Sequence, residues 1–141
     1  MASWKKIEDI DVWRDARVLS KHVHKICIAN KIDFRLRDQM FGSSGSIMDN
    51  IAEGFEVGNN RDFRKYLGYA RGSCGELRSQ LYRSLDKGLI DQATFEKLNN
   101  EAIQISKRLK TIIISLKNNN QRGFQFDEPL IPYGDSILEE E

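Results

Sequence analysis

Residues 46–60 read SIMDNIAEGFEVGNN and predict the end of one long helix and the start of another. Apolar side chains recur three and four residues apart, the spacing of one helical face, at Ile47, Met48, Ile51, Ala52 and Phe55. Gly58 and Asn59 then favour a turn, after which we expect Asn60 to cap the next helix. The rest of the chain is expected to pack around this bend.

The same spacing continues on both sides of the bend and predicts four helices. We expect Asp11 to cap the first, which runs to about Asn30, and the second to extend from about Leu36 to Phe55. The third should run from about Arg61 to Lys87. Asp91 is expected to cap the fourth, which ends near Asn118.

Each predicted helix carries one apolar seam that should face a shared core. The seams comprise Val12, Ala16, Leu19, Val23, Ile26 and Asn30; Met40, Ser44, Ile47, Met48, Ile51, Ala52 and Phe55; Phe63, Leu67, Ala70, Cys74, Leu77, Leu81 and Ser84; and Phe95, Leu98, Ala102, Ile105, Leu109, Ile112 and Leu116. Four such helices with short connections predict an all-α fold, an antiparallel up-down-up-down four-helix bundle over residues 1–118.

The last part of the chain, residues 119–141, differs in composition from the predicted bundle. Pro129, Pro132 and Gly134 interrupt any helix, so we expect a non-helical, extended or mobile acidic tail. Its one basic residue, Arg122, stands against Asp127, Glu128, Asp135, Glu139, Glu140 and Glu141. A basic body with an acidic tail suits a polyanion-binding protein whose tail shields it, and also an ordinary soluble domain.

Composition limits the cellular setting and the cysteine chemistry. The 141 residues suffice for one domain, and no apolar run is long enough to span a membrane. The N-terminus has no apolar signal core, so we expect a cytoplasmic protein with no membrane partner. Cys27 and Cys74 form no CxxC pair and fall on apolar helical faces, which predicts reduced core thiols.

No pattern of residues indicates catalysis, a metal or a cofactor. A di-metal bundle would need Glu-x-x-His pairs on two helices, and the chain has none. Its histidines, His22 and His24, lie two apart on one predicted helix and should point in different directions. Glu53 and Glu76 lie off the seams without a nucleophile, so we interpret them as structural carboxylates. We therefore predict a protein that is not an enzyme.

Several residues off the seams predict a second buried surface, most simply a contact between copies of the chain. Gly68, Gly72 and Gly75 lie at helical spacing on the third helix and allow another backbone to come close. Together they cost roughly 3 kcal/mol in helix propensity. Asp49 and Glu53 lie on the back of the second helix, with Arg71 or Arg78 as expected partners of Glu53. The predicted structural and interface residues are Asn50, Glu53, Gly54, Gly68, Gly72, Gly75, Glu76, Ile103 and Ile114.

Two basic stripes are the candidate functional surface. Arg14, Arg17, Lys21 and Lys25 fall within a narrow arc of the first helix, and Arg64, Arg71 and Arg78 are spaced by sevens on the third. Such stripes can neutralise the phosphates of RNA or DNA without reading sequence. An ordinary solvated face explains the same residues equally well.

A family resemblance rests on residues spread over most of the chain. They are Gln39, Ser46-Ile47, Asn50-Ile51-Ala52-Glu53-Gly54, Phe63, Tyr66-Leu67, Ala70, Gly72-Ser73, Glu76-Leu77, Leu81 and Gly88-Leu89-Ile90. Over roughly residues 5–117 the chain resembles the four-helix-bundle proteins encoded in intervening sequences of bacterial 23S ribosomal RNA genes. The resemblance implies a cytoplasmic bacterial bundle that assembles into a ring, with a homopentamer as the expected state.

The resemblance also implies distant kinship with the accessory variability determinant proteins of diversity-generating retroelements, which are small basic bundles that bind nucleic acid and a reverse transcriptase. It supplies no settled activity. We therefore expect a non-catalytic, homo-oligomeric binding or scaffold protein whose leading ligand is RNA or DNA. The alternative is a protein-binding adaptor with no nucleic-acid activity.

Overall fold

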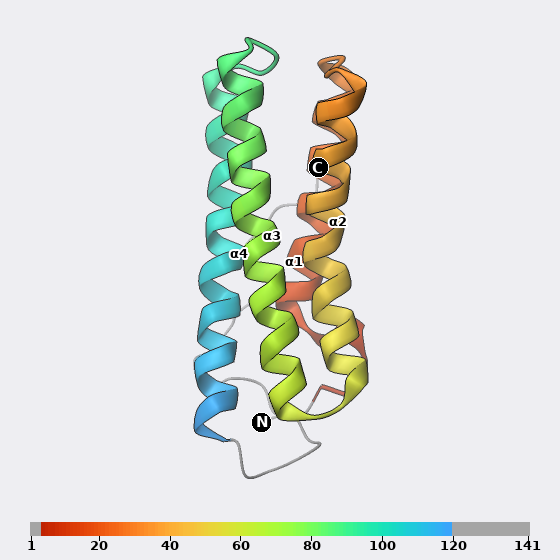
Figure 1. Cartoon of the computed structure of the whole chain (residues 1–141), viewed down its shortest axis with the longest axis vertical. Coiled ribbons are helices and arrows are strands. Elements are labelled where there is room, and N and C mark those ends of the chain that lie inside the picture. Colours follow the sequence, from red (N-terminus) through yellow and green to blue (C-terminus); the bar gives the residue numbers. More distant parts are fainter. Residues whose placement is uncertain (1–3, 120–141) are drawn as a thin grey trace.

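The computed structural model describes residues 4–119, and this part of the chain is an all-helical bundle (Figure 1). A 3-10 turn, η1 (Ile7–Asp9), precedes α1 (Asp11–Ala29). Three longer helices follow: α2 (Phe34–Val57), α3 (Asn60–Asp86) and α4 (Gln92–Asn118). The predicted fold class is confirmed, and no strand occurs among the described residues. Of the predicted tail, residues 119–141, all but Asn119 lie outside them.

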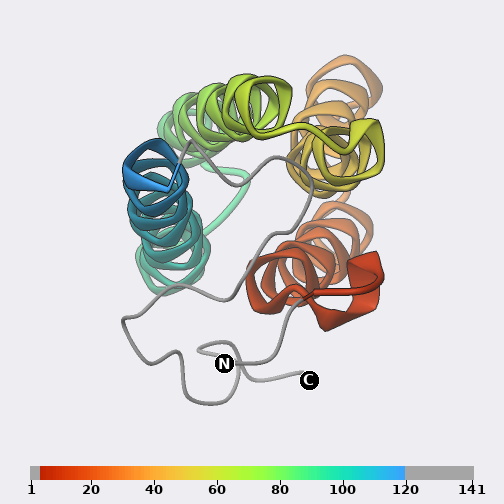
Figure 2. The same cartoon turned by 90° about the horizontal axis from the view of Figure 1, so that it is seen from below.

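The four helices form a square in cross-section, with sequential neighbours in contact (Figure 2). Contacts join α1 to α2, α2 to α3, α3 to α4, and α4 back to α1. Because the connections are short, neighbouring helices are antiparallel. The helices α1 and α3 are therefore diagonal to each other, as are α2 and α4, and residues on diagonal helices face different sides of the molecule.

The core consists of the predicted seams with small shifts in register. Val12, Leu19, Ile47, Leu67 and Ile105 are fully buried. The prediction that Asn30 ends the first seam is wrong, because α1 ends at Ala29 and Asn30 caps it with an exposed side chain. Cys27, four residues after Val23, takes the last core position of α1.

Two of the three predicted N-caps are displaced by one residue. Asn59, not Asn60, caps α3: its side chain accepts a 2.8 Å hydrogen bond from the Asp62 amide. Asn60 is instead the first helical residue and is buried, where its Nδ2 donates to the Leu116 carbonyl of α4 at 2.9 Å. Ile10 rather than Asp11 precedes α1, without a side-chain cap.

The remaining caps and turns follow the sequence. Asp91 caps α4 as predicted, since its carboxylate accepts from the Thr94 amide at 2.8 Å. Hydrogen bonds from the Thr94 side chain and from this amide lower the pKa of Asp91. Gly58 ends α2 with φ 87°, in the left-handed region that suits glycine, and so fixes the turn between α2 and α3.

Gly54 is the glycine that lets two helices of one chain come close. A Cβ on it would lie 2.6 Å from Cβ of Tyr66 and 3.1 Å from Cδ1 of Phe63, both on α3. A contact so short excludes any side chain larger than hydrogen. We predicted Gly54 as a structural or interface residue, and the structure gives it a role inside the subunit, at the crossing of α2 and α3.

Candidate nucleic-acid interface

The predicted basic stripe on α1 lies mostly at the surface. Arg17, Lys21 and Lys25 are exposed. Arg14 is half-buried and is held locally, because it donates to the Glu8 carbonyl at 2.6 Å and also bonds to the Asp11 carboxylate. Three of the four predicted side chains are therefore accessible at the surface, whereas Arg14 has a structural role at the start of the helix.

The three arginines of α3 follow its edge with α4, and two of them bond to that helix. Arg78 Nε donates to Asn99 Oδ1 at 2.8 Å, and Arg71 Nε donates to Ser106 Oγ at 3.4 Å. These two pairs are seven residues apart on each helix, which is the register of an antiparallel pair. Arg64 is half-buried on the same edge, another seven residues along.

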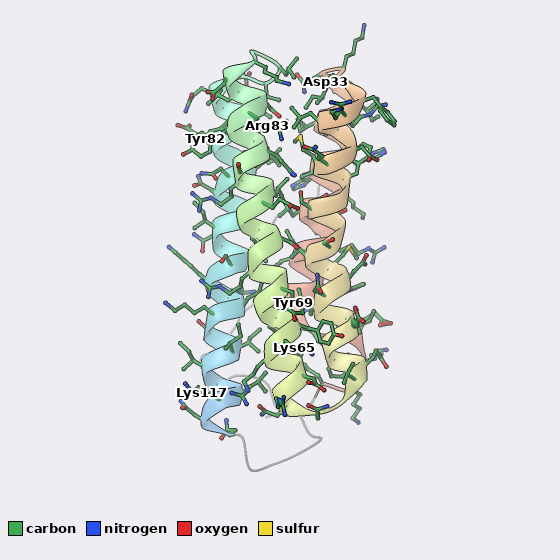
Figure 3. All side chains as sticks on the ribbon, in the orientation of Figure 1. Asp33, Lys65, Tyr69, Tyr82, Arg83 and Lys117 are labelled. Carbon is green, nitrogen blue, oxygen red and sulfur yellow. The ribbon has the colours of Figure 1, made fainter. Side chains whose placement is uncertain are left out.

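Sequence reasoning missed the lysines of α4, which lie between the two predicted stripes. Lys97, Lys107, Lys110 and Lys117 are exposed, and Lys117 projects from the last turns of the helix (Figure 3). The signal was available, because residues 102–119 contain no acidic residue. It was overlooked because this helix was interpreted through its apolar seam and its two off-seam isoleucines.

Together these side chains form a basic face across three helices. Since α4 contacts both α1 and α3, its lysines connect two stripes that diagonal helices would otherwise keep apart. We call this surface the basic face; it comprises Arg17, Lys21, Lys25, Arg64, Arg71, Arg78, Lys97, Lys107, Lys110 and Lys117. Glu96 is an exposed acidic residue on α4 beside it.

The opposite corner of the bundle is acidic beyond the first turn of α2, which carries Arg35 and Arg37. Residues 38–60 contain no lysine or arginine, and their acidic side chains on α2 are all exposed. These are Asp38, Asp49, Glu53 and Glu56. Because α2 is diagonal to α4, the bundle has a positive side and a negative side.

Two acidic residues that would weaken the basic face are buried beneath it and paired. His22 Nδ1 lies 2.9 Å from both carboxylate oxygens of Glu101, and Arg108 Nη1 donates to Asp15 Oδ2 at 3.0 Å. Both pairs join α1 to α4, and both are buried or nearly so. The surface of this junction is therefore left with a net positive charge.

The three predicted interface glycines of α3 have open space beside them within the subunit. A Cβ on Gly68, Gly72 or Gly75 would meet no atom within 4 Å, so the chain's own packing does not require these glycines. Ile114 is 50% exposed, whereas Ile103 is half-buried. Asn50 donates to the Ser46 carbonyl within its own helix. A contact between copies at these residues remains a prediction.

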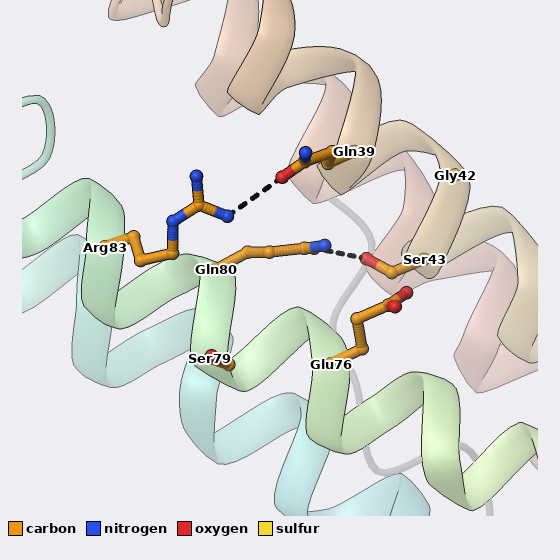
Figure 4. A pocket seen from close by; sticks show the side chains of 7 residues that line it. All are labelled: Gln39, Gly42, Ser43, Glu76, Ser79, Gln80 and Arg83. Atoms are coloured by element: carbon orange, nitrogen blue, oxygen red, sulfur yellow. Dashed lines mark hydrogen bonds between the residues drawn. The ribbon is translucent and has the colours of Figure 1, made fainter.

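The expected pairing of Glu53 with Arg71 or Arg78 does not occur inside the subunit. Glu53 is exposed on α2, while both arginines bond to α4 on the far side of α3. Glu76 instead lines an open polar pocket between α2 and α3, beside the bonded pairs Arg83–Gln39 and Gln80–Ser43 (Figure 4). The helical spacing of the sequence correctly placed Glu53 on the side of α2 away from the core, but it could not assign the residues that neighbour Glu53 on other helices.

Both cysteines are free and buried, as predicted. Burial raises the pKa of the Cys27 thiol to about 11 and that of the Cys74 thiol to about 12. The histidines point in different directions, as predicted: His22 is buried, whereas His24 is exposed and stacks on Phe41. Among the described residues, no helix has the length and apolarity to cross a membrane.

A family model described as "23S rRNA-intervening sequence protein" matches residues 8–111. The chain belongs to this family. The match starts within η1 and covers α1, α2, α3 and most of α4, so it includes every residue that carried the resemblance. The last turns of α4 and the acidic tail lie outside it.

A solved structure of a protein from Bacteroides thetaiotaomicron, described as being of unknown function and from the S23 ribosomal protein family, has a similar fold. The two structures align with a TM-score of 0.68 and 24% sequence identity, over 72% of this chain and 97% of that one. At this identity the likeness shows the fold alone. No curated protein matches the chain.

Proposed function

We propose that the protein is a non-catalytic, cytoplasmic binding protein that holds RNA or DNA against its basic face. The observation that supports this most is the separation of charge across the bundle, with exposed lysines and arginines around α4 and exposed carboxylates along α2. A surface that only kept the protein in solution would have no need for such a separation, since mixed charges serve that purpose better.

The chemistry of the basic face suits phosphates rather than bases. Arg17, Lys21 and Lys25 are spaced by roughly one helical turn, so they can follow a phosphate backbone. No element of the bundle projects from this face to enter a groove, which favours binding that tolerates any sequence. One exposed aromatic side chain, Tyr82, lies at the edge between α3 and α4, where its ring packs on Phe95.

The test is binding to a labelled structured RNA over a series of salt concentrations. The full-length protein should lose affinity steeply as salt rises. Arg17→Glu/Lys21→Glu should weaken binding strongly and reduce the slope of log affinity against log salt by about 2, roughly one for each lost phosphate contact.

The matched control is Lys31→Glu/Arg35→Glu, which makes the same change in net charge at the end of the bundle, away from α4. Both residues are exposed. It should bind RNA much more nearly like the wild type. Equal losses of RNA affinity in the two variants would show that only the net charge of the protein matters. No binding of RNA by the wild type at low salt would exclude nucleic acid as the ligand.

The second candidate function is a protein-binding adaptor with no nucleic-acid activity, whose partner would dock on the oligomer. The acidic side of α2 supports the contact between copies that such an oligomer needs. In a homo-oligomeric ring, this side of one copy can meet the basic face of the next, which is a head-to-tail contact between unlike surfaces. The homopentamer expected for the family fits such a closed ring. Light scattering of the wild type and of Asp49→Lys/Glu53→Lys tests it: loss of assembly mass supports the contact, and a monomeric wild type excludes it.

A further inference from the structure

An open cavity of about 250 Å³ lies at the junction of α1 and α4, inside the basic face. It is lined by His22, Lys25 and Ile26 of α1 and by Thr94, Lys97 and Leu98 of α4. The apolar side chains of Ile26 and Leu98 lower the local dielectric constant, which strengthens any ionic contact made there.

His22 brings an unused polar atom to this cavity. The side chain is 4% exposed, and its Nδ1 bonds to the Glu101 carboxylate. Nε2, the ring nitrogen turned away from Glu101, is buried and has no hydrogen-bond partner in the described part of the chain. Since buried polar atoms are nearly always satisfied, an orphaned ring nitrogen beside a cavity indicates a ligand that completes it.

The charges around the cavity determine what that ligand is. Lys25 and Lys97 contribute one cation from each helix. Glu101 is the carboxylate in contact with the histidine, at Nδ1, so Nε2 is the ring atom left to meet a ligand. Two ammonium groups, one from each helix, beside this ring nitrogen match the oxygens of a tetrahedral or planar anion.

We propose that this cavity is a binding site for an oxyanion, a phosphate or carboxylate group held by Lys25 and Lys97 beside Nε2 of His22. A phosphate of bound nucleic acid is one source, and in that role the site rests on the proposed function. A carboxylate of the chain's own acidic tail is the other source. Both sources present the same oxyanion chemistry to the cavity, and a variant of the tail distinguishes them.

The test uses the fact that the chain has two histidines, one at the cavity and one outside it. Full-length protein is titrated with inorganic phosphate at constant ionic strength, and the ring nitrogens of both histidines are followed by NMR. We expect a saturable shift of the His22 Nε2 signal, with no saturable shift of the His24 signals. No saturable shift of His22 would overturn the proposal.

Two lysine variants control for non-specific attraction. Lys97→Ala, an exposed residue of the cavity, should weaken phosphate binding at least tenfold. Lys110→Ala, an exposed lysine of the same helix outside the cavity, should leave it unchanged. Equal effects of the two variants would show diffuse attraction and count against the site.

The source is resolved with a full-length variant in which the six acidic residues of the tail are replaced by their amides. Tighter phosphate binding by this variant identifies the tail as the natural occupant, while unchanged binding identifies an external phosphate. The site and the proposed function can also fail separately. Saturable phosphate binding with no RNA binding would retain the site and remove the function.

Discussion

The Nδ1 atom of His22 lies 2.9 Å from both carboxylate oxygens of Glu101, and this pair joins the first helix to the last. Two helical turns away, Arg108 and Asp15 repeat the arrangement at 3.0 Å. The junction between α1 and α4 therefore has polar pairs within it. Such pairs contribute little net stability if both members are present and are costly when one is removed.

Glu101→Ala should lower the free energy of unfolding by about 3 kcal/mol, because it leaves the buried His22 ring without a partner. His22→Leu/Glu101→Leu should cost much less, since two apolar side chains need no hydrogen bonds. Urea denaturation measures both. Glu96→Ala, on the exposed side of the same helix, should change stability by less than about 0.5 kcal/mol. Equal losses in the single and double variants would contradict the pairing.

The glycines on α2 and α3 should respond in opposite directions to alanine. Gly54→Ala places a Cβ 2.6 Å from Tyr66 Cβ and should destabilise the fold by about 2 kcal/mol. Gly72→Ala meets no atom within 4 Å and should stabilise the isolated subunit by about 1 kcal/mol through helix propensity. Thermal denaturation gives the two signs, and destabilisation by Gly72→Ala in a monomer would refute the open surface.

The same glycines also test the predicted contact between copies. Gly72→Leu should leave the fold of the subunit intact, because nothing within it occupies that space. If Gly72 lies in an interface, the larger side chain should reduce the assembled mass measured by light scattering. An unchanged oligomeric mass would remove Gly72 from the interface.

The buried thiols should make the fold less stable at high pH. Burial raises the folded-state pKa of Cys27 from 9.0 to about 11 and that of Cys74 from 9.0 to about 12. The folded protein keeps protons that the unfolded chain releases, so the stability from these groups is complete below pH 9 and is lost as pH rises toward 11. Urea denaturation at pH 7 and pH 10 measures the loss.

The control for this pH dependence is Cys27→Ala/Cys74→Ala. Other groups also titrate above pH 9, but they do so equally in the wild type and in the variant. The fall in the free energy of unfolding between pH 7 and pH 10 should therefore be smaller in the variant. Identical falls would show that burial does not hold these protons.

Asn59 should carry the N-cap of α3. Asn59→Ala removes the acceptor of the Asp62 amide and should cost about 1 kcal/mol of stability. Asn100→Ala, at an exposed position inside α4, should be neutral or slightly stabilising, since alanine is the better helix former. A larger loss at Asn100 than at Asn59 would refute the cap.

Helix order, helix length and most of the core could be predicted because they follow from local spacing. Val12, Leu67 and Ile105 repeat at the period of a helix, and the period alone shows which side is buried. The errors came at boundaries. Asn59 and Asn60 are chemically equal candidates for a cap, and only packing against Leu116 of α4 selects Asn60 for burial.

The candidate site was predicted less completely, because the sequence of one helix does not determine which residues of other helices lie beside its basic side chains. The α1 stripe was found and is exposed at Arg17, Lys21 and Lys25. The α3 arginines were found, but their bonds to Asn99 and Ser106 depend on the register between two helices. The lysines of α4 joined the candidate site only because α4 lies between α1 and α3.

By itself the sequence determined four amphipathic helices, buried cysteines, the absence of a recognisable catalytic pattern and the family. These features depend on residue type and on spacing within one helix, and both can be read directly from the sequence. Only the tertiary structure decided that Gly54 marks a helix crossing, that His22 pairs with Glu101, and that positive and negative charges lie on opposite corners. Those depend on which helices are adjacent and on their register, and both are settled by packing between residues far apart in the chain.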